Sequence, residues 1–178
     1  LQIESAFIIC HNIIADPNFN SKLFDVLTEA NYIVFFLNNY QDEYFLPMLN
    51  MLIYKTYCIN HESLHTFYDI IPLLIDIINS PINNERFYAI DSLCYLITLQ
   101  DCFNFALENE LIPILEKSLA FSNAQLFIKS LNLINLIHEY DRSICIQDAG
   151  IVSLILRHIE YAKDLQIKII IDYFKSLI

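Results

Sequence analysis

Glycine is almost absent from this chain of 178 residues, which contains only Gly150, and proline occurs five times. So little glycine leaves few candidates for the tight turns that join β-strands, and no segment alternates between apolar and polar residues as a half-buried strand does. A glycine-rich phosphate-binding loop is excluded for the same reason. We therefore predict an all-helical fold connected by polar turns, and we expect no cofactor.

Long hydrophobic runs are also missing. Hydrophobic residues make up 56% of the chain, enough for a large core, but no run approaches the roughly 18 residues of a membrane span. The five cysteines are widely spaced, odd in number and without a C-x-x-C pair: Cys10, Cys58, Cys94, Cys102 and Cys145. This pattern is typical of reduced cysteines in an intracellular protein. We expect a cytoplasmic protein with no membrane insertion.

Positive charge is scarce. Ten lysines and arginines stand against 21 aspartates and glutamates, which gives a formal net charge of −11. Such an excess disfavours direct binding to the phosphate backbone of nucleic acids and attracts basic peptides or proteins. Solubility alone explains the same charge equally well, so both interpretations stay open.

The dominant feature that is present is an internal repeat. A helical apolar pattern over Asp69–Leu99 breaks at Asn79-Ser80-Pro81 and restarts, and the same order returns over Glu110–His138. A weaker copy covers Gly150–Ile178. A fixed period of about 41 residues is typical of stacked helical repeats.

Each repeat unit is predicted to contain a short, a middle and a long helix. One long helix over 1–15, the last of a preceding repeat, comes before four units at 16–58, 59–99, 100–139 and 140–178. The expected helices are 21–30, 32–40 and 42–58, then 62–69, 70–79 and 84–99, then 102–109, 111–121 and 123–138, then 142–149, 151–162 and 164–178. Both ends lack a polar capping unit, so we expect the natural protein to continue beyond this segment.

Overlaying the long helices aligns two columns of residues one helical turn apart. The columns are Asn12, Tyr54, Tyr95, Asn135 and Ser176, and Ile8, Asn50, Asp91, Leu131 and Asp172. Residues four apart share one helix face, so stacking would place the columns side by side as a ladder. The candidate binding residues are Asn12, Asn50, Tyr54, Asp91, Tyr95, Asn135 and Asp172. The alternative is that these polar residues form the solvated side of each helix.

The three-helix unit resembles the armadillo repeat over essentially the whole chain. The resemblance depends on the period, on the Ile-Pro-x-Leu opening of the middle helix, as in Ile71–Leu74, and on the ending Gln147-Asp148-Ala149-Gly150. It implies a right-handed superhelical solenoid whose long helices line a concave, peptide-binding groove. Importin-alpha-like nuclear-import adaptors of this family hold basic signal peptides with paired Trp and Asn. This chain keeps that Asn only at Asn12 and Asn135 and has no Trp.

These observations favour a non-enzymatic binding scaffold that holds an extended basic peptide or partner segment. Its cationic side chains would be held by the charge of Asp91 and Asp172 and by cation–π contact with Tyr54 and Tyr95. A nuclear-import adaptor, cytoplasmic and nuclear, is the most specific form of this hypothesis. A scaffold in a cytoskeletal, ciliary or signalling assembly is an alternative.

A zinc peptidase is an alternative from another class. His61-Glu62-Ser63-Leu64-His65 fits H-E-x-x-H, in which two histidines at i and i+4 chelate zinc and the glutamate acts as base. Glu85 follows at a spacing suited to a third ligand. Against this, Pro72 breaks any long helix, and the repeat register separates Glu85 from His65 by about 20 Å. An accidental match in a solvated turn is the favoured interpretation.

Overall fold

The computed structural model describes residues 9, 12–16, 18, 22, 44–120, 124–141 and 172. These residues contain helices and turns and no strand, so the predicted all-α class is confirmed for this part of the chain. In chain order the helices are α4 (Phe45–Ile59), the 3-10 helix η1 (His61–Ile70), α5 (Ile71–Ile77), α6 (Asn83–Leu96), α7 (Gln100–Glu108), α8 (Leu111–Ala120) and α9 (Ala124–Tyr140).

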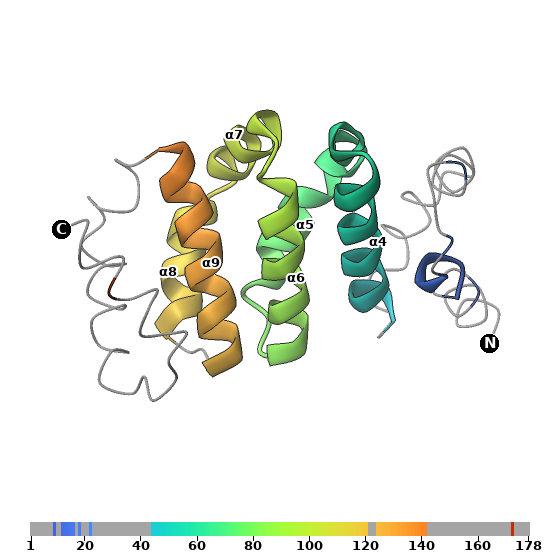
Figure 1. Cartoon of the computed structure of the whole chain (residues 1–178). Coiled ribbons are helices and arrows are strands. Elements are labelled where there is room, and N and C mark those ends of the chain that lie inside the picture. The colour runs from blue at the N-terminus through green and yellow to red at the C-terminus, as the bar shows by residue number, and fades with distance from the viewer. Residues whose placement is uncertain are drawn as a thin grey trace.

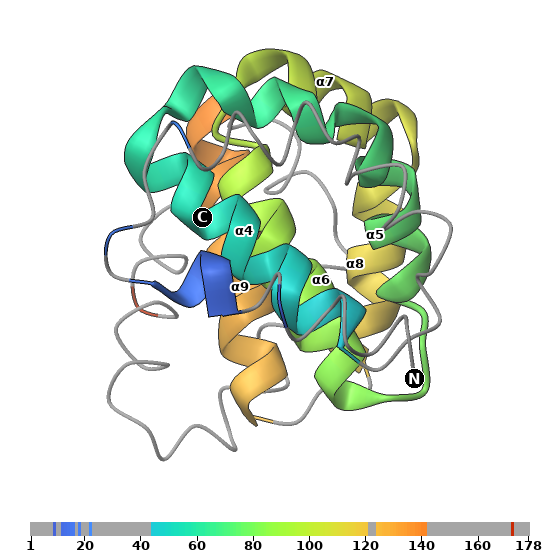
Figure 2. The same ribbon diagram turned by 90° about the vertical axis from the view of Figure 1, so that its right-hand side faces the viewer.

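The long helices stand side by side in one layer. Figure 1 shows α4, α6 and α9 in this order, with α5 and α8 behind them and α7 across one end. Viewed from the side, the α4, α6 and α9 layer and the α5 and α8 layer separate, and η1 and α7 close the same end (Figure 2). α6 is the central helix, since it packs against both α4 and α9.

A single hydrophobic cluster fills the space between the layers. It is built from the inward faces of every described helix, including Leu49, Ile53, Ile90, Leu93 and Ile134, all fully buried. On α4 the buried positions recur three and four residues apart, which is the period that puts them on one helix face. Each such side chain stabilises the fold by about 1.5–3 kcal/mol. The helices of neighbouring units are therefore held by one continuous core.

The short helix after α4 is a 3-10 helix rather than an α-helix. Its buried residues are Leu64, Phe67 and Ile70, at every third position. With 3.0 residues per turn these side chains align on one face, so the apolar spacing matches this tighter winding. η1 continues into α5 without a loop, and Pro72 lies in the first turn of α5, where its missing N–H is tolerated.

The seven helices predicted between residues 42 and 138 begin and end within three residues of α4, η1, α5, α6, α7, α8 and α9. The break predicted at Asn79-Ser80-Pro81 is present between α5 and α6, where Ser80 donates to Glu85 and its Oγ accepts from the Ile82 N–H at 3.1 Å. Residues 12–15 are helical and end at Asp16, whose Oδ1 accepts from the Asn18 N–H at 2.7 Å. The helices expected over 21–40 and 142–178 lie outside the described residues, apart from Lys22 and Asp172, both helical.

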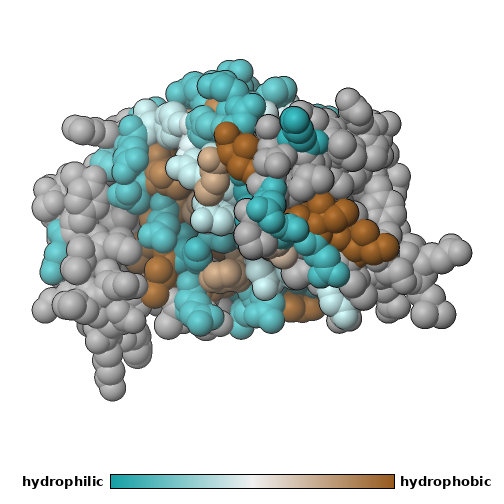
Figure 3. All heavy atoms as spheres, turned by 45° about the vertical axis from the view of Figure 1, so that its right-hand side comes forward, coloured by the Kyte–Doolittle hydropathy of each residue, from teal (hydrophilic) through white to brown (hydrophobic). Residues whose placement is uncertain are grey.

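The described surface is mixed in character. In the view of Figure 3 hydrophilic side chains predominate and hydrophobic ones form separate patches. Within the described ranges, no helix combines the length and the apolar character needed to cross a bilayer.

The turn from α7 to α8 contains the single left-handed non-glycine residue of the described chain, Glu110, with φ 63°. Asn109 closes α7, since its side-chain Nδ2 donates to the Phe105 carbonyl at 2.8 Å. In the repeat alignment Glu110 corresponds to Gly150, for which the sequence predicts the same backbone conformation. For a residue that has a Cβ, this conformation costs about 1–2 kcal/mol.

Replacing Glu110 by glycine is therefore expected to stabilise the protein. Because glycine is also more flexible in the unfolded chain, the net gain should be about 1 kcal/mol, or about 3 °C in Tm. Thermal unfolding measures it, with Glu110→Ala as the matched control because it removes the same carboxylate but keeps the Cβ. Equal Tm values for the two variants would contradict the backbone explanation.

Candidate binding surface on α4, α6 and α9

A network of polar side chains, the polar clip of Asn50, Asp91 and Lys129, links the three long helices. Asn50 Nδ2 on α4 donates to Asp91 Oδ2 on α6 at 3.2 Å and lies 3.2 Å from Ser92 Oγ. Asp91 Oδ1 accepts from Lys129 Nζ on α9, an ion pair whose side chains are 13% and 27% exposed. Both carboxylate oxygens of Asp91 are thus occupied.

Next to the polar clip lies an aromatic group, the tyrosine cluster of Tyr54, Tyr57 and Tyr95. The ring centroid of Tyr95 on α6 is 5.4 Å from that of Tyr54 and 5.4 Å from that of Tyr57, both on α4. Tyr54 and Tyr57 are 44% and 39% exposed, whereas Tyr95 is half-buried. Two aromatic side chains are therefore open to solvent beside a third ring that contacts both.

The clip and the cluster show how α4 and α6 are aligned. Asn50 contacts Asp91, and Tyr54, four residues further along α4, contacts Tyr95, four residues further along α6. The two helices consequently run parallel and in register, as the sequence columns predict.

His61 borders the tyrosine cluster and is held by Thr98, which follows α6. Its ring packs edge-on against Tyr57 at 5.6 Å, and its Nε2 lies 2.8 Å from Thr98 Oγ1. Thr98 Oγ1 already donates its hydrogen to the Tyr95 carbonyl at 2.6 Å, so it accepts from His61, and Nε2 carries the proton. Tyr140 on α9 donates to the Thr98 carbonyl and stacks on Phe103.

The structure brings together four of the seven candidate residues, namely Asn50, Tyr54, Asp91 and Tyr95. Asn135 on α9 instead donates to Glu139 of its own helix at 2.9 Å. Leu131, the α9 residue in the column of Asn50 and Asp91, is fully buried. Asn12 and Asp172 are exposed helical residues near the two ends of the chain, and the contacts of the clip and cluster involve neither.

Four contributing residues were not identified from the sequence: Tyr57, His61 as a cluster neighbour, Thr98 and Lys129. Tyr57 follows Tyr54 by three residues, so the rule that i and i+3 share a helix face was a sufficient signal. Lys129 lies two residues before Leu131 and in neither column, so the alignment offered no signal for it.

The residues of the zinc alternative are not brought together. In a 3-10 helix residues i and i+4 point about 120° apart, so His61 and His65 diverge. His65 Nδ1 donates to the Glu62 carbonyl at 2.5 Å. Glu85 lies in the first turn of α6, whereas His61 contacts Thr98 beyond the other end of that helix, about 20 Å away along its axis. The described part of the chain contains no cluster of three ligands suited to a metal.

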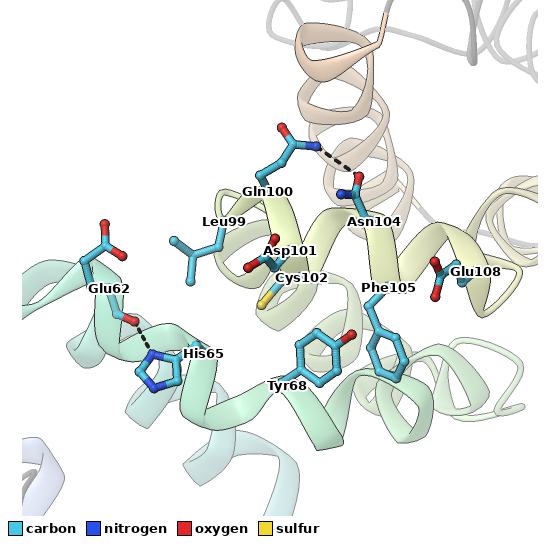
Figure 4. Close-up of a pocket in the computed structure, with 10 residues that line it drawn as sticks. All are labelled: Glu62, His65, Tyr68, Leu99, Gln100, Asp101, Cys102, Asn104, Phe105 and Glu108. Atoms are coloured by element: carbon cyan, nitrogen blue, oxygen red, sulfur yellow. Dashed lines mark hydrogen bonds between the residues drawn. The ribbon is translucent and has the colours of Figure 1, made fainter.

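An acidic groove of about 790 Å³ lies between η1 and α7, and no residue of the clip or cluster lines it (Figure 4). Its wall is the stacked pair Tyr68 and Phe105, with centroids 4.1 Å apart, and its carboxylates are Glu62, Asp101 and Glu108. Burial raises the pKa of the Tyr68 hydroxyl, and Glu108 adds to the shift. The pKa of the Cys102 thiol is raised to about 11 by burial and by Asp101, so this thiol stays protonated and unreactive at neutral pH.

Burial also controls protonation beside the polar clip. It raises the pKa of Tyr95 to about 12, with Asp91 adding to the shift. Burial raises the pKa of the Cys94 thiol to about 12 as well, again with a contribution from Asp91. In both residues the negative form is disfavoured, so the surface keeps neutral hydroxyl and thiol groups at physiological pH.

These shifts predict that the protein loses stability in alkaline solution. The folded-state pKa values lie above the ordinary values of 10.0 and 9.0, so the stabilisation is complete below pH 9 and is lost as pH rises to about 12. Urea unfolding across this range measures it. Tyr95→Phe should flatten the part of the decline above pH 10, and Cys94→Ala the part that begins near pH 9. Superimposable curves for wild type and both variants would contradict the assignment.

A double-mutant cycle tests the ion pair of the polar clip. Because Asp91 and Lys129 are only partly exposed, Asp91→Asn and Lys129→Met should show a coupling of about 1 kcal/mol in the free energy of unfolding. Asn135 and Glu139, a pair on the outside of α9, provide the control, with an expected coupling of about 0.3 kcal/mol. Additive effects at Asp91 and Lys129 would show that the pair contributes nothing.

No protein-family model matches this chain, and no curated protein matches it. We therefore infer function from the contacts, burial and charge of the described residues.

Proposed function

We propose that this chain is an armadillo-type solenoid that acts as a non-enzymatic binding scaffold. The parallel, in-register packing of α4 on α6 supports the solenoid, because the contacts of Asn50 with Asp91 and of Tyr54 with Tyr95 each join residues one repeat period apart. The layer of α4, α6 and α9 corresponds to the long helices that line the groove in armadillo proteins, and we assign the binding surface to it.

The tyrosine cluster is the observation that carries this proposal. Tyr54 and Tyr57 expose large parts of their rings although neither is needed to fill the core, and Tyr95 holds them at a fixed spacing. Aromatic side chains with open faces attract cations and contribute strongly to interfaces. With a net charge of −11 the chain attracts a basic segment, and the cluster offers it ring faces.

The partner we propose is an extended basic segment of another protein, held by its lysine and arginine side chains. Nuclear import is the most specific form of this function, although Tyr54 and Tyr95 stand in the column where import adaptors carry asparagine, and the chain has no tryptophan. A cytoskeletal, ciliary or signalling scaffold would use the same surface for a different partner.

Peptide binding tests the proposal. A fluorescein-labelled peptide of alternating lysine and alanine should bind the protein, measured by fluorescence anisotropy, and affinity should fall as salt is added. Each of Tyr54→Ala and Tyr57→Ala should weaken binding about fivefold, because a cation–π contact at an exposed site contributes about 1 kcal/mol.

The matched control is Tyr44→Ala. Tyr44 precedes α4, is 45% exposed, and lies about 15 Å along the helix from Tyr54. Its replacement should leave affinity unchanged, and a glutamate-containing analogue of the peptide should not bind. If all three tyrosine variants bind alike, the cluster is not the binding surface.

A further inference from the structure

Lys129 contacts two side chains, Asp91 and Phe87, that together have the composition of an ammonium-binding site. Its Nζ pairs with Asp91 Oδ1 and lies 5.3 Å from the centre of the Phe87 ring. Phe87 and Asp91 are four residues apart on α6, so a carboxylate and an aromatic face are presented together on one side of that helix. This is the combination that binds a lysine head group, through charge, hydrogen bonding and cation–π attraction.

The two sides of this contact differ in how firmly they are held. The Asp91 carboxylate is 13% exposed, and its second oxygen accepts from Asn50 Nδ2 on α4. Lys129 is 27% exposed and sits on a long, flexible side chain that can carry its ammonium into water. The acceptor is therefore preorganised, whereas the cation can leave.

We propose that Phe87 and Asp91 form a lysine-binding site, named here the recess, that the chain fills with its own Lys129, and that a lysine of the partner takes the same place. This proposal rests on the function proposed above. It adds a second contact for the partner, at Phe87 and Asp91, and names Lys129 as the side chain that competes for that contact. Lys129 then lowers affinity for basic partners, and the tyrosine cluster is the part of the surface that stays open in the free protein.

The geometry also sets the spacing of the partner's basic residues. Asp91 and Tyr95 lie one turn apart on the same face of α6, about 6 Å along its axis. In an extended peptide, side chains two residues apart point the same way and are separated by about 6.6 Å. A segment with two lysines and one residue between them matches the recess and the cluster at once.

Chemical rescue tests the recess without a partner. Lys129→Ala removes three methylene groups and the ammonium, which is the structure of propylammonium. Added propylammonium should raise the Tm of Lys129→Ala by several degrees more than it raises that of the wild type at equal ionic strength. Neutral 1-propanol should not do so, and Lys129→Ala/Asp91→Asn should lose the rescue. No difference between Lys129→Ala and wild type, or equal rescue in the double variant, would overturn the proposal.

Peptide affinity provides the second measurement. Lys129→Met is measured beside Lys129→Ala, because it keeps the apolar stem of the side chain and serves as the test if Lys129→Ala folds poorly. Removing the internal competitor should raise affinity for a Lys-Ala-Lys peptide about tenfold, and Lys129→Arg should leave it near the wild-type value. A peptide with its two lysines adjacent should gain less.

The two proposals fail in different ways. Rescue by propylammonium with no peptide binding by any variant would remove the proposed function and keep the recess. Peptide binding by the wild type that is unchanged in Lys129→Ala and Lys129→Met, with no rescue, would remove the recess and keep the scaffold.

Discussion

The structure depends on the parallel packing of α6 between α4 and α9. A helix that packs on both sides must bury two of its faces, and α6 does so with Ala89, Ile90 and Leu93 in the common core. Parallel direction and a constant repeat length make equivalent residues meet, so the contact between Asn50 and Asp91 and the contact between Tyr54 and Tyr95 have the same origin. Without that register the polar clip and the tyrosine cluster would not exist as neighbouring surfaces.

Polar residues at this interface are constrained because it is partly dry. A carboxylate that is 13% exposed needs partners, and Asp91 obtains one from each neighbouring helix. Tyr95, one turn further along α6, is half-buried as well, but it contacts the rings of the exposed Tyr54 and Tyr57 instead of forming an ion pair. A difference of one helical turn therefore converts an enclosed ionic contact into an open aromatic surface, and this is why we assign different roles to two columns that look alike in the sequence.

Much of the fold was predictable, and the reasons are local. Polar breaks such as Asn79-Ser80-Pro81 and the 3.6-residue apolar period locate the long helices, and the period of the repeat aligns them. The 3-10 winding of η1 was not predicted, although the three-residue spacing of Leu64, Phe67 and Ile70 indicates it. That spacing also separates His61 from His65, so an H-E-x-x-H motif that suggests zinc in an α-helix does not form a chelating pair here.

The candidate site was less predictable because an alignment of repeats assumes that equivalent positions have equivalent surroundings. Leu131 disproves this on α9, because it is fully buried and this position of the column offers Asp91 no polar side chain. The charge that Asp91 requires is supplied by Lys129, which lies two residues earlier and outside both columns. A mostly buried carboxylate that has no partner at the equivalent repeat position can pair with a cation from any nearby position. Only the packing of the helices shows which cation that is. Equivalent positions on the long helices therefore differ in chemistry, and each position can bind only through the side chains that the neighbouring helices leave exposed.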